Sequence, residues 1–259
     1  MSVAFSTCDL LGMQLAQIDG ARLLDHMFEG LATGRGGWIV TANLDFIRRF
    51  ATDPEIRSLY AAADIRVADG MPLVWAARLQ GDTLPGRLAG SDLAWEIPAR
   101  AALEGRSIYL LGGTATANAR AAEVLATRWP GLVIRGHSSP MVSSPPTSDE
   151  LSAIRRALEP APPDILLVGM GSPKQEHLIH ALRSFYPAMW SVGVGASFSF
   201  IAGEVQRAPA WMQRSGLEWC WRLGQEPRRL ARRYLVEDLP FFCRLMAGAA
   251  ARRAFRQRR

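Results

Sequence analysis

The stretch Val-Gly-Met-Gly-Ser-Pro-Lys-Gln-Glu, residues 168–176, decides the fold of this chain. It follows the apolar run 165–167, which predicts a buried strand, and it precedes apolar residues at helical spacing. Ser172 is a candidate N-cap, Pro173 suits the first helical position, and Gln175 falls three residues after the cap, as in a capping box. A strand that turns through glycines into a helix N-terminus presents backbone N–H groups that can bind phosphate. The alternative is that Ser172 and Gln175 only cap the helix.

Apolar runs that predict strands alternate with helical stretches along the rest of the chain. Such alternation predicts an α/β fold with a Rossmann-like, largely parallel sheet as its core. Ligands bind such sheets beyond the carboxyl ends of the strands, so we expect the residues at those ends to converge in one crevice. The predicted strands are residues 38–41, 64–67, 108–111, 133–134, 165–168 and 190–194. Their ends carry Thr41, Asn43, Asp69–Gly70, Gly112–Gly113, Gly169–Gly171 and Gly193–Gly195.

The sequence changes character near residue 208. Residues 1–207 carry all the strand signals and form the predicted α/β core, whereas residues 208–259 form a predicted helical, arginine-rich C-terminal appendage. From Cys220 onward, eleven arginines and three acidic residues give a local charge of +8, against +6 for the whole chain. Such asymmetry predicts an anionic partner: a membrane surface, a nucleic acid or a diphosphate.

The last part of the appendage has an amphipathic pattern. Pro240 can open a final helix in which Phe242, Leu245, Met246 and Ala249 share one face. An amphipathic helix with arginines predicts reversible binding to an anionic membrane. No apolar run approaches the ~20 residues that span a bilayer, and the N-terminus lacks a signal-peptide pattern.

Metal and cofactor sites have little support in the sequence. The three cysteines, Cys8, Cys220 and Cys243, are far apart and odd in number, which favours a reducing cytoplasm over a disulfide framework or a zinc site. His177 and His180 lie three apart without further ligands nearby, which favours a surface or packing role. We therefore expect no metal and no cofactor.

Residues 38–240 carry a series of short motifs: Thr41–Asn43, Ala68–Gly70, Arg87–Gly90, Leu110–Gly113, Val168–Glu176, Gly193–Ala196, Ala202–Gly203, Arg207–Pro209, Gly216–Trp219, Arg222–Leu223 and the Arg229 and Arg232 motif after Glu226. In order and spacing, these motifs resemble the WecG/TagA/CpsF family of bacterial glycosyltransferases. The resemblance implies a GT-E type fold and an inverting, metal-independent hexosyltransferase of cell-surface polysaccharide or exopolysaccharide synthesis. It implies a UDP-sugar donor, with glucosyl and N-acetylmannosaminyl transfer both open, and a polyprenyl-diphosphate-linked sugar acceptor. It also implies a peripheral place on the anionic, cytoplasmic face of the inner membrane, with no nucleic acid as partner.

The resemblance also implies roles for single residues. Asp69 is the expected general base, because inversion requires an acceptor hydroxyl to lose its proton; the alternative is a simple Asp-Gly turn. The other expected site residues would bind the donor and its diphosphate, since guanidinium groups suit phosphate oxygens. Each of them has a purely structural alternative as a helix cap, a loop residue or a solvated helix face. They are Thr41, Asn43, Arg87, Gln175, Glu176, Arg222, Arg229 and Arg232.

The sequence departs from the family pattern in three places. Ala68 stands where a proline commonly precedes the Asp-Gly pair, which is a minor change. Ser199 stands where an acid is common, which puts the nucleotide contacts in doubt. Residues 136–146 are rich in Ser and Pro where the family often has a Gly-aromatic-Phe loop, so the sugar or acceptor pocket is expected to differ.

Two other functions compete with this one. A nicotinamide-dependent oxidoreductase would suit a Rossmann-like sheet, but Phe198 stands where the Gly193-x-Gly195 turn needs a third glycine. A membrane or nucleic-acid adaptor would work through the basic appendage. That function leaves Asp69 and the Gly-Ser-Pro-Lys-Gln-Glu segment unexplained.

Overall fold

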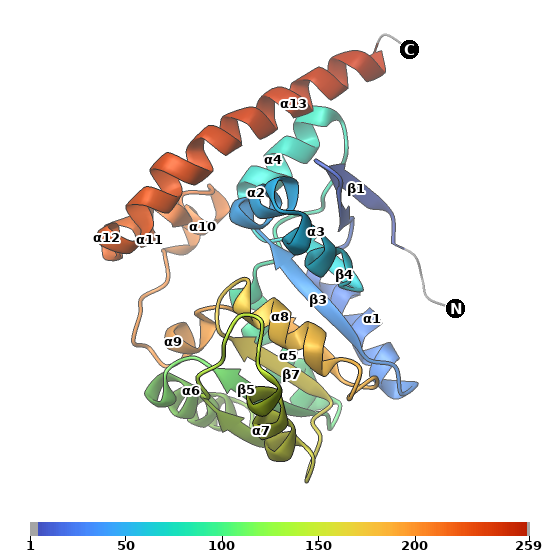
Figure 1. Cartoon of the computed structure of the whole chain (residues 1–259), viewed down its shortest axis with the longest axis vertical. Helices are drawn as coiled ribbons and strands as arrows, with labels where there is room; N and C mark the ends of the chain where they lie inside the picture. Colours follow the sequence, from blue (N-terminus) through green and yellow to red (C-terminus); the bar gives the residue numbers. More distant parts are fainter. Residues whose placement is uncertain (1–4, 258–259) are drawn as a thin grey trace.

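The computed structural model describes residues 5–257, apart from the side chain of Arg229. Its central sheet contains β3 (Gly37–Ala42), β4 (Ile65–Ala68), β5 (Ser107–Gly112), β6 (Val133–Ser138), β7 (Ile165–Gly169) and β8 (Trp190–Gly193). The six strands are all parallel, in the order β4-β3-β8-β7-β5-β6. Helices cover both faces, and the C-terminal helices gather at one end of the molecule (Figure 1). The predicted α/β fold with a parallel sheet is confirmed.

Alternating side chains of the strands enter two separate cores. Tyr109 and Leu111 of β5 belong to one core, whereas Ile108 and Leu110 belong to the other. Both faces of the sheet are therefore apolar, as expected when helices cover both sides. The first core packs against α2 (Leu44–Thr52), α3 (Pro54–Ala61), α4 (Met71–Gln80), α7 (Ser148–Leu158) and α8 (Lys174–Leu182). The second packs against α1 (Gly20–Ala32), α5 (Gly90–Leu103), α6 (Ala115–Arg128) and α9 (Ser197–Ile201).

An N-terminal hairpin, β1 (Thr7–Leu10) and β2 (Met13–Ala16), was not predicted from the sequence. Its turn places Leu11 at φ 54° and Gly12 at φ 90°. Asp9 Oδ1 accepts a hydrogen bond from the Gly12 N–H at 3.1 Å. Leucine rarely adopts a left-handed conformation, so the sequence gives no clear sign of this turn.

The helix after the glycine turn begins differently from the prediction. α8 starts at Lys174 with Pro173 in the N-cap position, so the prediction that Ser172 caps this helix is wrong. The Ser172 hydroxyl is instead hydrogen bonded to the Tyr60 hydroxyl at 2.7 Å. Gln175, the expected partner in a capping box, turns its amide toward neighbouring loops. These polar side chains therefore connect separate segments of the fold instead of closing the first turn of one helix.

The strand predicted at residues 133–134 continues to Ser138, so residues 136–138 are not loop. β6 lies at the edge of the sheet, and its residues are only half-buried or exposed. A Cβ at Gly136 would lie 2.8 Å from the Tyr109 ring, so β5 and β6 approach closely here. An exposed edge strand carries no apolar run, which explains why the sequence pattern missed its second half.

The predicted helical appendage is helical, and its last helix lies along α4 of the core (Figure 1). Phe241, Leu245 and Ala249 of that helix are buried in the first core. Much of the apolar face that we expected to be available to a membrane is therefore turned onto the protein. The helices of the appendage are α10 (Ala210–Arg214), α11 (Glu218–Gln225), α12 (Pro227–Ala231), the π-helix η1 (Arg232–Asp238) and α13 (Leu239–Gln257).

Two arginines secure the end of α13 to the core. Arg252 lies 2.7 Å from Asp9 of β1, and Arg256 lies 2.8 Å from Asp82, which follows α4. The side chains of both arginines are about half exposed, and ion pairs at such exposed positions stabilise a fold only weakly. Packing of the apolar residues is therefore the main attachment of α13. No helix within residues 5–257 combines the length and the apolarity of a membrane span.

Candidate active site

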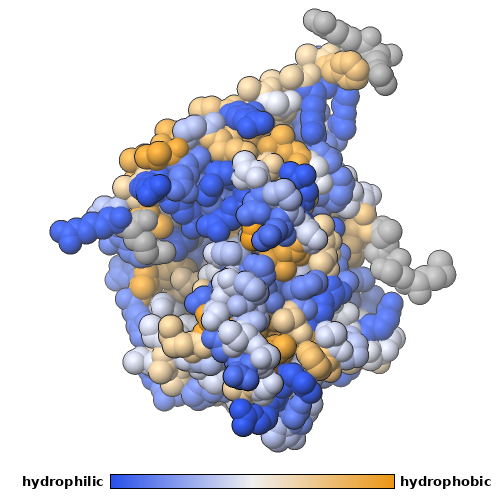
Figure 2. Space-filling view, viewed as in Figure 1, coloured by the Kyte–Doolittle hydropathy of each residue, from blue (hydrophilic) through white to orange (hydrophobic). Residues whose placement is uncertain are grey.

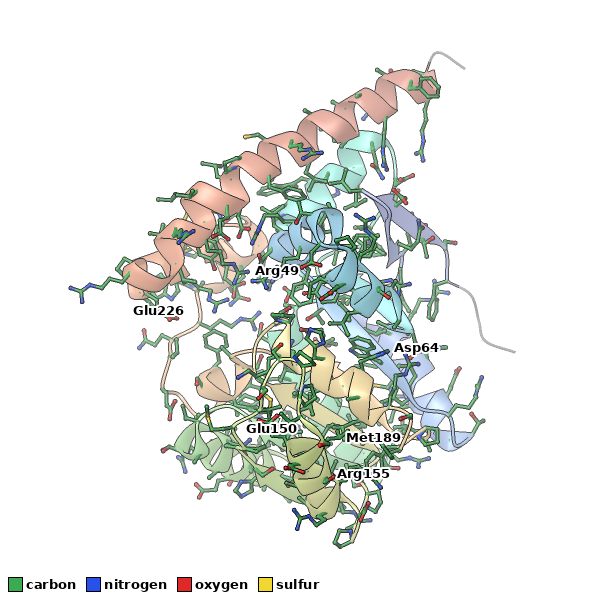
Figure 3. All side chains as sticks on the ribbon, viewed as in Figure 1. Arg49, Asp64, Glu150, Arg155, Met189 and Glu226 are labelled. Carbon is green, nitrogen blue, oxygen red and sulfur yellow. The ribbon has the colours of Figure 1, made fainter. Side chains whose placement is uncertain are left out.

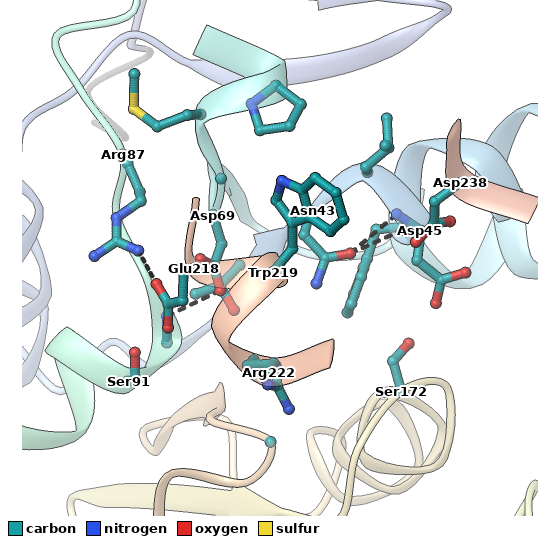
Figure 4. Close-up of a pocket in the computed structure, with 18 of the residues that line it drawn as sticks. Asn43, Asp45, Asp69, Arg87, Ser91, Ser172, Glu218, Trp219, Arg222 and Asp238 are labelled. Carbon is teal, nitrogen blue, oxygen red and sulfur yellow. Dashed lines mark hydrogen bonds and ion pairs between the residues drawn. The ribbon is translucent and has the colours of Figure 1, made fainter. Parts of the chain in front are cut away.

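A cavity of about 570 Å³ opens where β3, β4, β7 and β8 end. α4 and the appendage supply its other walls (Figure 4). The expected convergence of strand ends therefore holds for these four strands, whereas Gly112 at the end of β5 and Gly113 after it lie outside the cavity wall. The core lines the cavity with residues that include Thr41, Asn43, Asp69, Arg87, Gly171, Ser172, Gln175, Gly193 and Gly195. The appendage lines it with residues that include Gln213, Glu218, Trp219, Arg222, Arg233, Tyr234 and Asp238.

Asp69 lies on the cavity wall directly after β4. Its backbone N–H donates to the Ala42 carbonyl at 2.7 Å, which fixes the residue beside the end of β3. Its Oδ2 accepts a hydrogen bond from the Gly90 N–H at 3.3 Å. Burial raises the pKa of Asp69 to about 6, although the charge of Arg87 and the Gly90 hydrogen bond act in the opposite direction. Such a carboxyl is ionised at neutral pH and is a stronger base than an ordinary aspartate.

Arg87 lines the cavity but is held by side chains of the protein. Its guanidinium donates to Glu218 at 2.5 Å, to Gln213 at 3.1 Å and to Asp92 at 3.3 Å. Glu218 and Gln213 belong to the appendage, so these bonds connect the appendage to the core across the cavity (Figure 4). An anionic ligand that reaches Arg87 must share it with Glu218 or displace that carboxylate.

Arg207 adds a second guanidinium to this cluster, and we did not single it out as a site residue from the sequence. It donates to Asp92 at 2.5 Å, and its Nε lies 3.7 Å from a Glu218 oxygen. Its Nε and one terminal nitrogen are buried with no hydrogen-bond partner among the described residues. The only sign in the sequence was its place in the Arg-Ala-Pro motif.

Thr41 and Asn43 line the cavity at the end of β3. Thr41 Oγ1 lies 3.4 Å from the Gly193 carbonyl and so connects β3 to β8. Asn43 caps α2, because its Oδ1 accepts hydrogen bonds from the N–H groups of Asp45 at 3.1 Å and Phe46 at 3.3 Å. The capping and cavity roles are compatible, since capping leaves the Asn43 Nδ2 available as a donor to a ligand.

Gln175 lies at the floor of the cavity with both ends of its amide engaged. Its Oε1 accepts hydrogen bonds from the N–H groups of Gly171 at 3.2 Å and Gly195 at 3.1 Å. Its Nε2 donates to Glu176 at 2.7 Å. A Cβ at Gly193 would lie 2.4 Å from that nitrogen, so the amide requires glycine there. Two N–H groups of the glycine turns, where we expected phosphate to bind, are therefore occupied by Gln175.

Glu176 is not part of the cavity wall, in contrast to its expected place in the donor site. It is buried behind Gln175, and its Oε2 has no hydrogen-bond partner among the described residues. Burial raises the pKa of Glu176 to about 7, against the opposing effect of the hydrogen bond from Gln175. Direct contact with a ligand in the cavity is therefore not available to Glu176 in this arrangement.

The three expected appendage arginines lie in different surroundings. Arg222 of α11 lines the cavity (Figure 4), and its guanidinium has no ion pair with any described residue. Arg232 does not line the cavity; its side chain is 85% exposed and lies 3.6 Å from Glu237. The side chain of Arg229 lies outside the described part of the chain. Arg233, which we did not predict, lines the cavity instead.

Arg233 connects the appendage to α2 through two carboxylates. Its guanidinium lies 3.5 Å from Asp45 and 3.4 Å from Asp238. Arg48 of α2 lies 3.3 Å from Asp238 and also pairs with Asp45. This network lies where α2 faces the appendage, next to Arg49, which is labelled in Figure 3. The π-helical geometry of η1 changes the angular spacing of its residues, so α-helical periodicity could not indicate which arginine faces the core.

The surroundings of Phe198 disfavour a dinucleotide site. Its ring is 1% exposed and packs against Gly113 and Gly169, where a Cβ at Gly169 would lie 2.7 Å from the ring. The glycines after β5 and at the end of β7 therefore accommodate an aromatic ring. Ser199, like Phe198, does not line the cavity. Ser197 and Phe200 of the same helix do line it.

Metal ligands are not grouped in the part of the chain that the structure describes: within it, no three His, Cys, Asp or Glu side chains are arranged to hold an ion. His177 and His180 lie on α8, and the His180 ring lies 6.1 Å from that of Trp38. Independence from metal stays a prediction, because a nucleotide can bring its own cation to a site.

Comparison with known protein families gives a match. The model described as "Glycosyl transferase WecG/TagA/CpsF family" matches residues 8–255. The match covers nearly the whole chain, including most of the N-terminal hairpin, the cavity and most of the appendage. It therefore extends on both sides beyond residues 38–240, which carry the motifs quoted above.

Proposed function

Since this chain belongs to the WecG/TagA/CpsF family of glycosyltransferases, we propose that it transfers a hexose from a UDP-sugar to a polyprenyl-diphosphate-linked sugar with inversion. Inversion is a direct displacement at the anomeric carbon by an acceptor hydroxyl. The site must therefore remove one proton and stabilise one leaving diphosphate. The family acts in cell-surface polysaccharide synthesis, and we propose a lipid-linked intermediate of that synthesis as the acceptor.

The position and basicity of Asp69 carry this proposal. In the proposed step the acceptor oxygen bonds to the anomeric carbon and its proton passes to Asp69. The bond from that carbon to the diphosphate breaks, and its electron pair leaves with UDP. A pKa of about 6 keeps Asp69 ionised at neutral pH and close enough to the working pH to accept the proton effectively.

The leaving diphosphate needs positive charge or hydrogen-bond donors. Arg222 is the best candidate, because it lines the cavity and has no carboxylate partner among the described residues. Arg87 becomes available when Glu218 releases it. Thr41 and the Asn43 amide supply donors at the end of β3 for the sugar or the nucleotide. Contacts from Arg229 and Arg232 remain part of the proposal, and the contact from Arg232 would require the appendage to move.

We also propose that the appendage attaches the protein peripherally to the cytoplasmic face of the inner membrane. Hydrophobic side chains gather over the appendage along the upper edge of the face seen in Figure 2, next to hydrophilic surface. Trp211, Leu235, Val236 and Leu239 are each about half exposed or more. Because the buried face of α13 is occupied by the core, these residues of α10, η1 and the start of α13 are the ones that reach lipid. Nearby arginines would add attraction to anionic headgroups.

The decisive experiment offers a set of nucleotide-sugars to the protein with a synthetic polyprenyl-diphosphate-sugar acceptor. We expect UDP release that depends on the acceptor, together with a lipid product heavier by one hexose-type residue. The anomeric configuration of that product, determined by NMR, tests inversion. UDP release without acceptor measures hydrolysis and serves as the control. Absence of acceptor-dependent release with every UDP-sugar would contradict the proposed function.

A further inference from the structure

Two glycine turns meet below the cavity, and one side-chain amide joins them. The turn after β7 contains Gly171, and the turn after β8 contains Gly195. Both N–H groups donate to the single Oε1 of Gln175, at 3.2 Å and 3.1 Å. These two turns line the cavity, so the orientation of this amide fixes part of the cavity floor.

The amide of Gln175 can hold this position in one orientation only. Rotation by 180° would turn its NH2 group toward two N–H donors and leave them without an acceptor. The other side of the amide therefore needs an acceptor that favours NH2 there. Glu176 supplies it, since its Oε1 accepts from Gln175 Nε2 at 2.7 Å. Both side chains are removed from bulk solvent: Gln175 is 4% exposed and Glu176 is 1% exposed.

We infer that Glu176 is a positioning residue, which acts on the reaction by fixing the Gln175 amide and, through it, the two glycine turns that form the cavity floor. This inference rests on the proposed function for its kinetic consequences, but the geometry on which it depends can be measured without turnover. It assigns Glu176 a place behind the ligand, different from the direct contact expected from the sequence.

The contact requires an acceptor oxygen and not a negative charge. A carboxyl group keeps such an oxygen whether it is ionised or protonated. The other neighbours of the Glu176 carboxyl group are Ser172, the Tyr60 hydroxyl that is hydrogen bonded to Ser172, and Arg49 of α2. A glutamine at position 176 would also present an oxygen to Gln175. The role of Glu176 can therefore be separated from that of a charged ligand or a base.

Three single variants and one double variant test the inference. Glu176→Leu removes the acceptor, and Glu176→Gln retains it. Gln175→Glu places two carboxylates at a hydrogen-bond distance, and combining it with Glu176→Gln exchanges the two side chains and restores every hydrogen bond with the donor on the other residue. Ile179→Val, a buried change on the same helix, is the control for a general loss of packing.

We expect Glu176→Leu, and Gln175→Glu at a pH at which both carboxyl groups are ionised, to lower kcat/KM for the donor by about tenfold or more, the effect of losing a buried hydrogen bond. Glu176→Gln should lose less than about threefold, and the exchanged pair should recover most of the loss of Gln175→Glu. Hydrogen exchange of the Gly171 and Gly195 amides, followed by NMR, should be faster in Glu176→Leu than in wild type and in Ile179→Val. This readout still decides the inference if the wild type shows no transfer, a result that would count against the proposed function alone.

Two outcomes would overturn the inference. If Glu176→Gln is as impaired as Glu176→Leu, the carboxylate charge is what matters. If Glu176→Leu lowers the melting temperature but leaves kcat/KM of the folded protein and both amide exchange rates unchanged, Glu176 is only a buried part of the fold.

Discussion

At the scale of the residue, Asp69 is the most specific element of the proposed chemistry. Asp69→Asn retains the shape of the side chain and an oxygen for the Gly90 N–H, but it removes the proton acceptor. We expect turnover to fall by about 10²-fold or more while the fold persists. UDP release from the folded variant measures this, and turnover like that of the wild type would reject Asp69 as the base.

The raised pKa of Asp69 has a second consequence, for stability. The folded protein binds this proton more tightly than the unfolded chain, in which the pKa is near the ordinary value of 3.8. The contribution of Asp69 to the free energy of unfolding therefore becomes less favourable as the pH rises from about 4 to about 6. Asp69→Asn should melt at a higher temperature than wild type at pH 8, and the difference should shrink toward pH 4. A variant that melts at a lower temperature at pH 8 would contradict the burial of a charged group here.

At the scale of the element, buried strands were predictable and exposed ones were not. β3, β5, β7 and β8 are apolar on both faces and appear in the sequence as continuous runs. The outer half of β6 and the β1–β2 hairpin lack such runs. In the site, the residues found from the sequence are those at strand ends, such as Thr41 and Asp69. Glu218 and Arg233 were missed because their positions depend on how the appendage packs onto the core. No local sequence pattern indicates that packing.

The chain segment that leads into α11 packs closely against α4, and this contact depends on a glycine. Gly216 has φ +74°, and a Cβ there would lie 2.7 Å from Trp75 and 2.8 Å from Met71. Gly216→Ala should displace α11, weaken the contact of Glu218 with Arg87 and lower turnover by about tenfold or more, since a small misplacement of site residues has large kinetic effects.

Gly224→Ala is the matched control for this change. Gly224 lies in α11 itself, its φ is not positive, and a Cβ there meets no atom within 4 Å. We expect this variant to transfer sugar at nearly the wild-type rate. Limited proteolysis of the appendage, measured together with UDP release, shows whether α11 remains packed against the core. Equal activity and equal protease resistance of the two variants would show that close contact with Trp75 is not required.

At the scale of the whole molecule, the appendage both closes the cavity and carries the proposed membrane surface. Trp211→Ser combined with Val236→Ser should reduce sedimentation with anionic liposomes by about fivefold or more, because two exposed apolar side chains no longer enter the lipid. Leu103→Ser is the control, since Leu103 is 83% exposed but belongs to α5. Equal losses in both proteins would place the lipid contact elsewhere.

The proposed mechanism uses arginines and no metal ion to meet the diphosphate. Transfer should therefore continue in excess EDTA at nearly its original rate. The measurement is UDP release before and after chelation, with magnesium and manganese added back in turn. Loss of transfer with EDTA and its return with either cation would show that the guanidinium groups are insufficient.

The bond from Glu218 to Arg87 has a further consequence for the design of inhibitors. The appendage places the Glu218 carboxylate, with the Trp219 indole beside it, on a core arginine that also faces the cavity. A small molecule that copies this carboxylate and its adjacent aromatic ring would compete with the protein's own helix. Such a compound would displace α11 from its position over the cavity, and because Arg87 is also a proposed contact of the donor diphosphate, its potency would fall as the concentration of the sugar donor rises.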